Sequence, residues 1–517
     1  MPSAPLTRRR LLQSAATASI ATSVGCAGPQ ASQRPVDDVG SSSVGILAQD
    51  VSDEVHADCA VDGQWPRDLR GTLFRNGPGF YERDGYRKRS FLDGDGMIRR
   101  YRLDNGRVLF SNRFVRTAKY VDEQTAGRFL YASWTTRQPG GVLANVSGTS
   151  FHELGDAGVS VTYRDGHLHA FSESAQSWRL HPDTLDTLGV DELGMHADRS
   201  TVLTAHGKID PRNQHWCHFG VDYVSGAMFL FELDAQGRPL THRKVSIDRR
   251  VYQHDWFVTA NHFVVLLHPC HIDVLGVVMG TSSFKHAMRW APSDGTIALV
   301  FDRRNLHDDP VRIDVPGRYM WHSINGFDDG DDVVCDFVGY DDPDHFIGPH
   351  PVTDTAVNGV AGTFQSPGQV LRLRLSTTRK TFTEERLFDG NHEFPAMQRR
   401  RLTAPTSTWW SASASTGAQF FNGVSRFDLQ SDRHTSHFFG PDVYCGEPLP
   451  TDDERHLLVE VHDGRQRKSG LAVFNASHVE DGPLAIAWHP FPIGMSFHGT
   501  FVPQLFGNHD ATTVARR

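Results

Sequence analysis

The sequence is poor in cysteine and has no surplus of positive charge, and both features exclude classes of protein. Six of the 517 residues are cysteine, and no two form a Cys-x-x-Cys pair, so a dense disulfide framework and a zinc–thiolate site are unsupported. Lysine and arginine total 52 against 61 aspartate and glutamate, a formal net charge of −9, which argues against a nucleic-acid-binding protein. No glycine-rich fingerprint for a flavin or dinucleotide occurs. We expect the five cysteines after Cys26 to be small buried hydrophobic residues.

The first 30 residues are typical of an export signal. Arg8, Arg9 and Arg10 precede a mild apolar stretch over residues 11–25, which is too short to span a bilayer. An arginine pair before Leu-Leu resembles the twin-arginine signal. We therefore predict a twin-arginine signal peptide over residues 1–30 and export to the periplasm or beyond. A disordered basic tail is the alternative.

Two further expectations concern the residues around this signal. Cys26 is a candidate for a lipid anchor, although Ser23 stands where an aliphatic residue is usual in a lipoprotein cleavage site. Residues 31–50 are rich in Ser, Gly, Gln and Pro, and we predict a flexible lead-in there.

Beyond residue 50 the sequence is typical of an all-β protein with many short strands. Apolar residues make up 39% of the chain, enough for a sizeable core. Strand-like runs occupy residues 159–163, 263–267 and 296–301, residues 370–375 alternate as a half-buried strand should, and residues 121–129 are a short helix candidate. Many short strands in one long domain over residues 51–510 favour a β-propeller. Hairpin-type dipeptides separate the runs: Asp84-Gly85, Asn105-Gly106, Asp165-Gly166, Asp294-Gly295, Asn325-Gly326 and Asp463-Gly464.

Histidine is unusually frequent, with 28 among 517 residues. Four histidines stand in distinctive local settings, separated by 48, 68 and 176 residues, so a site that they share must be assembled from distant segments. A propeller does this readily because its inner strands all face one axis. The four are His206, His254, His322 and His498.

Together these segments resemble the carotenoid cleavage oxygenases, a family that includes lignostilbene dioxygenases and the retinal-pigment-epithelium isomerase. The resemblance spans roughly residues 55–505. It is carried by Phe-Arg-Asn-Gly-Pro at 74–78, Phe-Leu-Asp-Gly-Asp-Gly-Met at 91–97, Asn-Arg-Phe-Val-Arg-Thr at 112–117 and His-Pro-Asp-Thr-Leu-Asp-Thr-Leu-Gly at 181–189. Each motif alone is modest, but chance does not produce so many in order.

The resemblance implies a seven-bladed β-propeller with a loop or helical cap over one face and one ferrous iron per subunit on the axis. It makes the four histidines the iron ligands. His206 matches the motif Ala-His-Pro-Lys-x-Asp-Pro, with Gly207 in place of the usual proline. His322 heads the motif His-x-x-Asn-Ala-aromatic-Glu, with Gly326 and Asp328 in place of alanine and glutamate.

The other two ligand settings follow the family pattern as well. His254 precedes Asp-Trp, and His498 begins His-Gly-x-x-Val-Pro. Five further histidines lack such settings and are expected to have ordinary structural roles: His215, His218, His262, His268 and His271.

Three glutamates match the carboxylates with which the family orients its ligands. They are Glu173 in Phe-Ser-Glu-Ser, Glu393 in His-Glu-Phe-Pro and Glu447 in Gly-Glu-Pro. A carboxylate that accepts the far N–H holds an imidazole neutral and in one tautomer. In the family the equivalent of His206 has no such partner.

The implied activity is oxidative cleavage of a carbon–carbon double bond. Four neutral nitrogen ligands leave ferrous iron its full charge and up to two open positions. Without a bound electron donor, the substrate must supply all the electrons, and splitting an electron-rich alkene into two carbonyls with both atoms of O₂ meets that condition. The expected partners are O₂ and a small apolar conjugated substrate. A non-cleaving isomerase and a metal-free propeller binding module stay open, as does the oligomeric state.

Two observations bear on the substrate and its route. Lignostilbene-cleaving relatives hold a phenolate with a lysine just upstream of the segment at 152–158, and this chain has no lysine between Lys119 and Lys208. That favours a carotenoid or apocarotenoid over a stilbene, the alternative substrate. The apolar run at 274–279 falls where the family carries an apolar surface near the tunnel mouth, so it is either a peripheral membrane contact or a buried strand.

The export signal is testable by conservative substitution. Replacing Arg8 and Arg9 by lysine keeps the charge but removes the twin-arginine pair, so we expect the precursor to accumulate inside the cell. Fractionation and immunoblotting measure this, and labelled palmitate tests Cys26 separately. Export that survives the double substitution would contradict the twin-arginine route.

Overall fold

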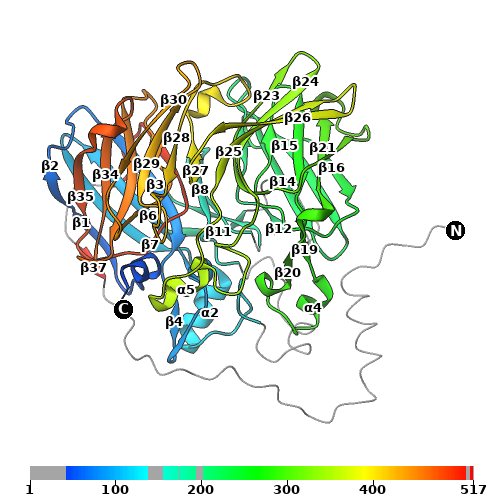
Figure 1. Ribbon diagram of the computed structural model, residues 1–517. Coiled ribbons are helices and arrows are strands. Elements are labelled where there is room, and N and C mark those ends of the chain that lie inside the picture. The colour runs from blue at the N-terminus through cyan, green and yellow to red at the C-terminus, as the bar shows by residue number, and fades with distance from the viewer. Residues whose placement is uncertain are drawn as a thin grey trace, which may run out of the picture.

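The computed structural model of this protein forms seven β-sheets arranged as blades around one axis (Figure 1). It describes residues 42–137, 155–173, 175–191, 193, 202–507 and 513–515. The predicted all-β, seven-bladed propeller is thereby confirmed. The predicted signal peptide and Cys26 lie outside the described residues.

The first four blades are built mainly from residues 54–315. Blade 1 pairs β36 (His498–Val502), β3 (Gly71–Pro78), β6 (Gly96–Asp104), β7 (Arg107–Phe114), β1 (Glu54–Asp58) and β37 (Thr513–Ala515) in that order. Blade 2 contains β8 (Ser160–Arg164), β9 (His167–Phe171), β10 (Ser177–Leu180) and β11 (Thr187–Asp191). Blade 3 contains β12 (Val202–Leu203) and β13 (Lys208–Ile209), which both pair with β14 (Trp216–Asp222), then β15 (Ala227–Leu233) and β16 (Pro239–Ser246). Blade 4 contains β17 (Phe257–Val258), β18 (His262–Leu267), β21 (Thr296–Asp302) and β22 (Val311–Val315).

The last three blades follow the same plan. Blade 5 contains β23 (Tyr319–Asp329), β24 (Asp332–Tyr340), β25 (Gln369–Ser376) and β26 (Thr381–Phe388). Blade 6 contains β27 (His392–Ala396), β28 (Thr408–Ser413), β29 (Gly423–Asp428) and β30 (Arg433–Phe438). Blade 7 contains β31 (Val443–Cys445) and β32 (Leu449–Pro450), which both pair with β33 (His456–Asp463), then β34 (Lys468–Asn475), β35 (Pro483–Trp488) and β2 (Ala60–Gly63).

Both ends of the chain close the ring. β36, near the carboxyl terminus, pairs with β3 of blade 1, and β2, near the amino terminus, pairs with β35 of blade 7. The inner strands of neighbouring blades contact one another around the axis, as β17 does with β23 and β23 with β27. Residues on these strands can therefore meet although they are far apart in sequence.

The α-helices lie on one face of the propeller, at the bottom of Figure 1, and form the predicted cap together with the small hairpin of β4 (Glu82–Arg83) and β5 (Tyr86–Arg87). The cap helices are α2 (Ala118–Ala126), α4 (Val274–Val278) and α5 (Val352–Thr355). A second small hairpin pairs β19 (Cys270–Ile272) with β20 (Met288–Trp290). The 3-10 helices are η1 (Ser43–Ala48), η2 (Phe91–Asp93), η4 (Lys285–Ala287), η5 (Pro292–Asp294), η6 (Arg303–Asn305), η7 (Ala356–Asn358), η8 (Arg399–Arg401) and η9 (Val479–Asp481).

Most local predictions are confirmed, with small shifts in boundary. The predicted helix at 121–129 is α2, which begins after Thr117, whose side chain caps the helix, and ends at Gly127 with φ +65°. The dipeptides Asn105-Gly106 and Asp165-Gly166 both have positive φ at each residue, as tight hairpins of type I′ require. The five cysteines in the described part of the chain are buried and unpaired, as expected.

Two of the predicted hairpin turns are wrong. Asn325-Gly326 lies inside β23, where space at Gly326 is tight because a Cβ would lie 3.0 Å from Cβ of Phe257. Asn325 donates to the carbonyl of Ala404 and so bridges to blade 6. Asp294-Gly295 joins η5 to β21 and connects no paired strands. A dipeptide pattern alone does not show which strands pair, so it cannot exclude either arrangement.

The predicted flexible lead-in over residues 31–50 is wrong at its carboxyl end. Residues 43–48 form η1, and Val44, Ile46 and Leu47 are fully buried in a hydrophobic core cluster with blade 7. The amide of Met495 donates to the carbonyl of Leu47 at 3.0 Å. This short apolar run was overlooked because Ser and Gly dominate its surroundings.

The apolar run at 274–279 is not a buried strand. It forms α4, capped by Asp273, whose side chain accepts the amide of Gly276 at 3.0 Å. Leu275 is 60% exposed, while Val278 packs inward. An exposed apolar helix on the cap face is consistent with the surface alternative. Among the described residues, no helix is long and apolar enough to cross a membrane.

The seam between blade 1 and blade 7 contains a buried ion pair. Glu460 on β33 accepts a hydrogen bond from Arg99 on β6 at 2.9 Å, and both side chains are fully buried. Tyr101 and Ser496 also donate to this carboxylate. Burial raises the pKa of Glu460, but the positive charges of Arg99 and Arg75 outweigh burial and lower the pKa to about 2.

We expect Glu460→Gln to lower the free energy of unfolding by about 3–5 kcal/mol, because Arg99 keeps its buried charge and loses its counter-charge. The folded pKa of about 2 lies below the ordinary 4.5, so the wild type loses this stabilisation as the pH falls from about 4.5 to about 2 and the variant does not. Urea denaturation at neutral and at acidic pH measures both effects.

Asp58→Asn is the matched control for this experiment. Asp58 pairs with Arg107 at 2.7 Å, but both side chains are more than half exposed. Its loss should change the free energy of unfolding by less than about 1 kcal/mol. Equal changes in the free energy of unfolding for the two substitutions would contradict the stabilising role of the buried Arg99–Glu460 pair.

Candidate metal centre

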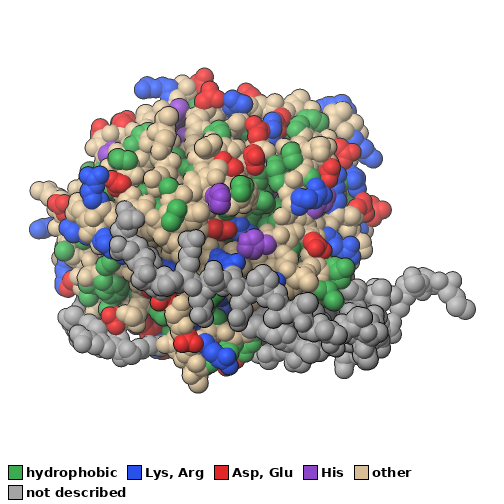
Figure 2. Space-filling view, turned by 60° about the horizontal axis from the view of Figure 1, so that its bottom comes forward, with side chains coloured by type: hydrophobic (Ala, Val, Ile, Leu, Met, Phe, Trp, Pro, Cys, Tyr) green, Lys and Arg blue, Asp and Glu red, His purple; other side chains and the backbone are tan. Residues whose placement is uncertain are grey.

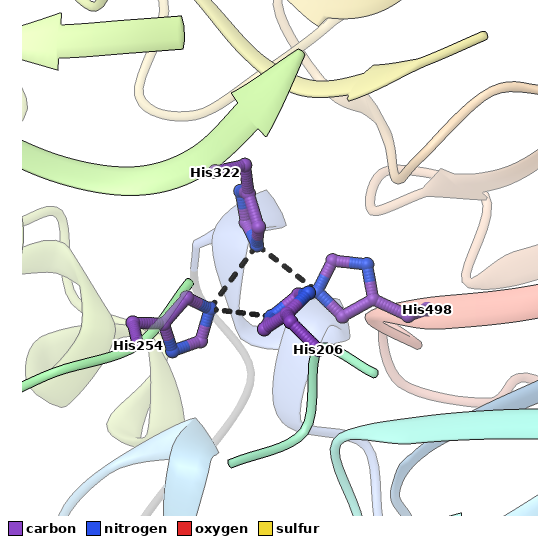
Figure 3. Close-up of side chains that lie close together, drawn as sticks. All are labelled: His206, His254, His322 and His498. Carbon is purple, nitrogen blue, oxygen red and sulfur yellow. Dashed lines mark hydrogen bonds between the residues drawn. The ribbon is translucent and has the colours of Figure 1, made fainter. Parts of the chain in front are cut away.

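Four histidine side chains converge on the propeller axis (Figure 3). Their Nε2 atoms form a chain of close pairs: His206 to His254 at 3.0 Å, His254 to His322 at 3.2 Å, and His322 to His498 at 3.0 Å. One nitrogen from each ring lies within 4.8 Å of the others, and three of the residues are buried. The four histidines singled out in the sequence therefore meet at one point.

The four histidines come from four different blades, and strand irregularities direct two of them to the axis. Leu203 and Lys208 pair with Gly220 and Cys217, so the strand that carries His206 has two more residues than its partner. The pairing of β23 shifts around His322 in the same way. Such bulges re-aim a side chain next to a functional site.

Three carboxylates from the remaining blades lie behind the histidines. Glu447, between β31 and β32 of blade 7, has Oε1 2.9 Å from Nδ1 of His498. Glu393 on β27 of blade 6 contacts Nδ1 of His322. Glu173 follows β9 of blade 2, and its Oε1 lies 2.5 Å from Nδ1 of His254. Each of the seven blades thus contributes one residue to the centre.

These contacts determine where the imidazole protons lie. Each carboxylate accepts a hydrogen bond from an Nδ1–H group, so the proton stays on Nδ1 and the lone pair is on Nε2. Nε2 of His322 then lies 3.2 Å from that of His254 and 3.0 Å from that of His498, with the lone pairs of all three directed inward. Such an arrangement is favourable only around a cation. Neighbouring nitrogens about 2.1 Å from one metal ion at right angles are about 3.0 Å apart, so the described residues fit a metal ion.

Burial governs the electrostatics of the centre. Burial and the neighbouring histidines hold the pKa values of His206 and His322 well below the ordinary value, so both rings are neutral. Burial raises the pKa of Glu393 to about 8, and a central cation would favour its carboxylate form. Burial also raises the pKa of Glu447, but His498 and Arg75 more than offset this and leave the pKa lowered.

Sequence reasoning missed two residues of this network. Arg75 is 1% exposed and donates to Oε2 of Glu447 at 2.7 Å. The hydroxyl of Tyr252 donates to Glu173 and lies 3.0 Å from Nδ1 of His254. Arg75 was visible as a charged residue within the motif at 74–78, but its partner could not be inferred. Tyr252 had no signal beyond its position two residues before His254.

A further network ties three histidine-bearing strands together. The buried side chain of Asp255 accepts from Lys208 at 2.8 Å and from the amide and hydroxyl of Ser323 at 2.8 and 2.7 Å. Lys208 also donates to the hydroxyl of Ser323 at 2.9 Å. Each of these residues lies one or two positions after a histidine of the centre. One carboxylate therefore fixes the relative positions of three strands.

The departures from the family motif have local explanations. Asp328, in place of glutamate, accepts from Thr259 at 2.8 Å and from both nitrogens of Asn261, and contacts His262 at 2.7 Å. It thus joins blade 5 to blade 4 with the shorter side chain. The five histidines expected to be structural lie outside the cluster, as His215 does in its pair with Glu232 at 2.6 Å.

The fold and the centre together define a β-propeller protein with a four-histidine metal site on its axis. Residues 48–503 match the sequence model of the family described as retinal pigment epithelial membrane protein. The chain therefore belongs to this family, the carotenoid cleavage oxygenases.

Individual relatives agree with this assignment. The apocarotenoid-15,15'-oxygenase of Synechocystis sp. is 26% identical over 461 residues, which cover 85% of this chain and 92% of that protein. The lignostilbene-alpha,beta-dioxygenase isozyme III of Sphingomonas paucimobilis is 23% identical, covering 86% and 93%. A cobalt-substituted structure of the Synechocystis apocarotenoid oxygenase has the same fold, with a TM-score of 0.79 at 24% identity over 89% of this chain and 98% of that one.

The carboxylates behind the histidines should control metal affinity. We expect Glu447→Gln to weaken metal binding about 10–100-fold, because a neutral amide accepts a weaker hydrogen bond from the Nδ1–H group of His498 than a carboxylate does. Replacing His498 by alanine removes a ligand and should abolish most metal retention. Metal content and competition with a chelator measure both effects.

Glu232→Gln is the matched control, since Glu232 forms a similar pair with His215 away from the axis. It should leave metal affinity unchanged. Equal affinities of the Glu447 and Glu232 variants would contradict the assigned role of Glu447.

Proposed function

We propose that this protein is a non-haem Fe(II) dioxygenase that cleaves a carbon–carbon double bond of a carotenoid or apocarotenoid into two carbonyl products. The observation that carries the proposal is the convergence of three carboxylate-backed imidazoles and a fourth on the propeller axis. Imidazole suits iron among other metals, and family membership favours iron here. An iron ion held by His206, His254, His322 and His498 would supply the redox chemistry by which O₂ attacks an electron-rich alkene.

The residues of this chain fix the conditions for that chemistry. Glu173, Glu393 and Glu447 hold the Nδ1 protons and keep the imidazoles neutral and oriented. Because the four ligands are neutral, the metal ion keeps its full charge. The substrate alkene supplies the electrons, so that one alkene and one O₂ give two carbonyl groups with no other reactant.

Aromatic side chains beside the centre support an apolar conjugated substrate. Trp321 packs with its ring centroid 4.6 Å from that of His254, and its indole nitrogen donates to His345 at 2.8 Å, which fixes the ring. Phe394 lies 5.1 Å from His322 and 5.7 Å from His498 between ring centroids. Flat aromatic faces stack well on a conjugated chain.

The substrate class rests on two further arguments. The Synechocystis relative at 26% identity acts on apocarotenoids by its name. The stretch between Lys119 and Lys208 contains no lysine that could hold a phenolate, although residues 138–154, where the family position falls, are outside the described part. Both arguments favour a carotenoid or apocarotenoid over a hydroxystilbene.

The cap face and the amino terminus support two subsidiary proposals. Exposed Leu275 on α4 is suited to peripheral contact with a membrane, from which an apolar substrate would come. Figure 2 shows acidic and basic side chains interspersed with hydrophobic ones over the uncovered part of the surface turned forward, so any such contact would be local. The twin-arginine sequence supports export of the chain.

The reaction is tested with purified protein, Fe(II), substrate and ¹⁸O₂. We expect an apocarotenoid to give two aldehyde or ketone fragments, each with one labelled oxygen, with no reductant consumed. Mass spectrometry of promptly trapped products measures this. The His498→Ala variant should be inactive, and the Asp58→Asn variant should match the wild type.

Three outcomes would contradict parts of the proposal. A requirement for an external electron donor would exclude the dioxygenase reaction, and an isomerised but uncleaved product would make the protein an isomerase. Faster cleavage of hydroxystilbenes than of any polyene would reverse the substrate assignment and favour a stilbene dioxygenase.

A further inference from the structure

His206 differs from the other three histidines in how it is held. No residue in the described part of the chain hydrogen-bonds to its Nδ1, whereas a carboxylate lies behind each of the others. Its main chain is held instead. The hydroxyl of Ser160 on blade 2 donates to the carbonyl of Ala205 at 2.6 Å, and the indole of Trp256 on blade 4 donates to the carbonyl of His206 at 2.9 Å.

Gly207, the next residue, stands where the family motif has proline. Its φ is outside the left-handed region, so the backbone itself does not require glycine. The requirement is one of space. A Cβ at this position would lie 2.2 Å from both Nε2 and Cε1 of His218 and 2.6 Å from the indole nitrogen of Trp216. His218 therefore occupies the volume that any side chain at position 207 would need.

The His218 ring cannot move aside. It is 0% exposed and lies between Phe171 and Phe231, with ring centroids 5.2 and 5.5 Å away and near-parallel planes. The Trp216 ring packs against its edge at 4.6 Å. Burial lowers the pKa of His218 to about 3, so the ring is neutral. Neither of its nitrogens has a hydrogen-bond partner among the described residues, so its contact with Gly207 is steric.

His218 lies on the partner strand directly opposite the bulge that directs His206 to the axis. It belongs to β14, whose residues Cys217 and Gly220 pair with the strand on either side of that bulge. A glycine in a bulge has wide conformational freedom, which would let the ligand drift. The fixed imidazole beneath it removes that freedom.

We propose that His218 is a positioning residue for His206: wedged under Gly207, it fixes the ligand loop that a proline fixes in the family motif and a carboxylate fixes at the other three histidines. This inference rests on the proposed metal site. It predicts that positions 207 and 218 are coupled, so that adding volume at one is tolerated only when volume is removed at the other.

The test is a double-substitution cycle with Co(II) as the metal probe. We expect Gly207→Ala to weaken Co(II) binding by about 10-fold or more, in the range of other changes that misplace a ligand. His218→Ala should weaken binding as well and broaden the ligand-field absorption of bound Co(II), because the loop is loosened. In the combined variant the new methyl group enters the vacated space, and affinity should recover beyond that of Gly207→Ala alone.

The control separates positioning from general stability. His268→Ala removes another buried histidine, which donates to the carbonyl of Arg318 and contacts none of the four ligands. It should lower the melting temperature but leave Co(II) affinity and the absorption spectrum unchanged. If Gly207→Ala does not fold, the His218→Ala and combined variants still give the comparison.

The outcomes distinguish this inference from the proposed function. Wild-type Co(II) affinity and spectrum in both single variants would overturn the positioning role, and so would purely additive losses in the combined variant. Failure of the wild type itself to bind Co(II), with His498→Ala no different, would instead refute the metal centre on which the inference depends.

Discussion

The structure depends on one electrostatic constraint: imidazole nitrogens with inward lone pairs must lie about 3 Å from their neighbours in the cluster. Their separations of 3.0–3.2 Å are repulsive unless a cation lies between them, and the Nδ1 protons must point outward to carboxylates. A buried carboxylate is itself costly, so Glu447 needs Arg75 and Glu173 needs Tyr252. Three of the four histidines therefore depend on a surrounding layer of glutamates, and two of these glutamates depend in turn on Arg75 and Tyr252.

A propeller meets this constraint because it brings seven inner strands to one axis, and here each blade supplies one histidine or one glutamate. Regular strand pairing would not direct every ligand side chain toward the axis. Bulges around His206 and His322 change the pairing register there and turn these two side chains inward. The buried pair of Arg99 and Glu460 closes the ring between its first and last blades. The stability of that seam and the geometry of the centre are therefore linked.

The centre also explains why the proposed chemistry needs little beyond metal, O₂ and substrate. Its ligands are neutral, its immediate surroundings include Trp321 and Phe394, and its carboxylates act on protons that stay on the ligands. In the proposed reaction the chain binds and orients an apolar alkene and takes no part in electron transfer itself.

The sequence pattern by itself determined an all-β protein of short strands and singled out four histidines, and the resemblance carried by its motifs implied the seven blades, the ligand roles and the three glutamates. Short strands were recognisable from alternation and hairpin glycines, as at residues 370–375 and Asn105-Gly106. The tertiary structure alone decided that Asn325-Gly326 lies within a strand, that residues 43–48 are buried, and that Arg75, Tyr252 and Asp255 support the centre. These roles arise from contacts between residues tens to hundreds of positions apart. In the same way, the need for glycine at position 207 is apparent only from the structure, in which the His218 ring occupies the space that a side chain there would take.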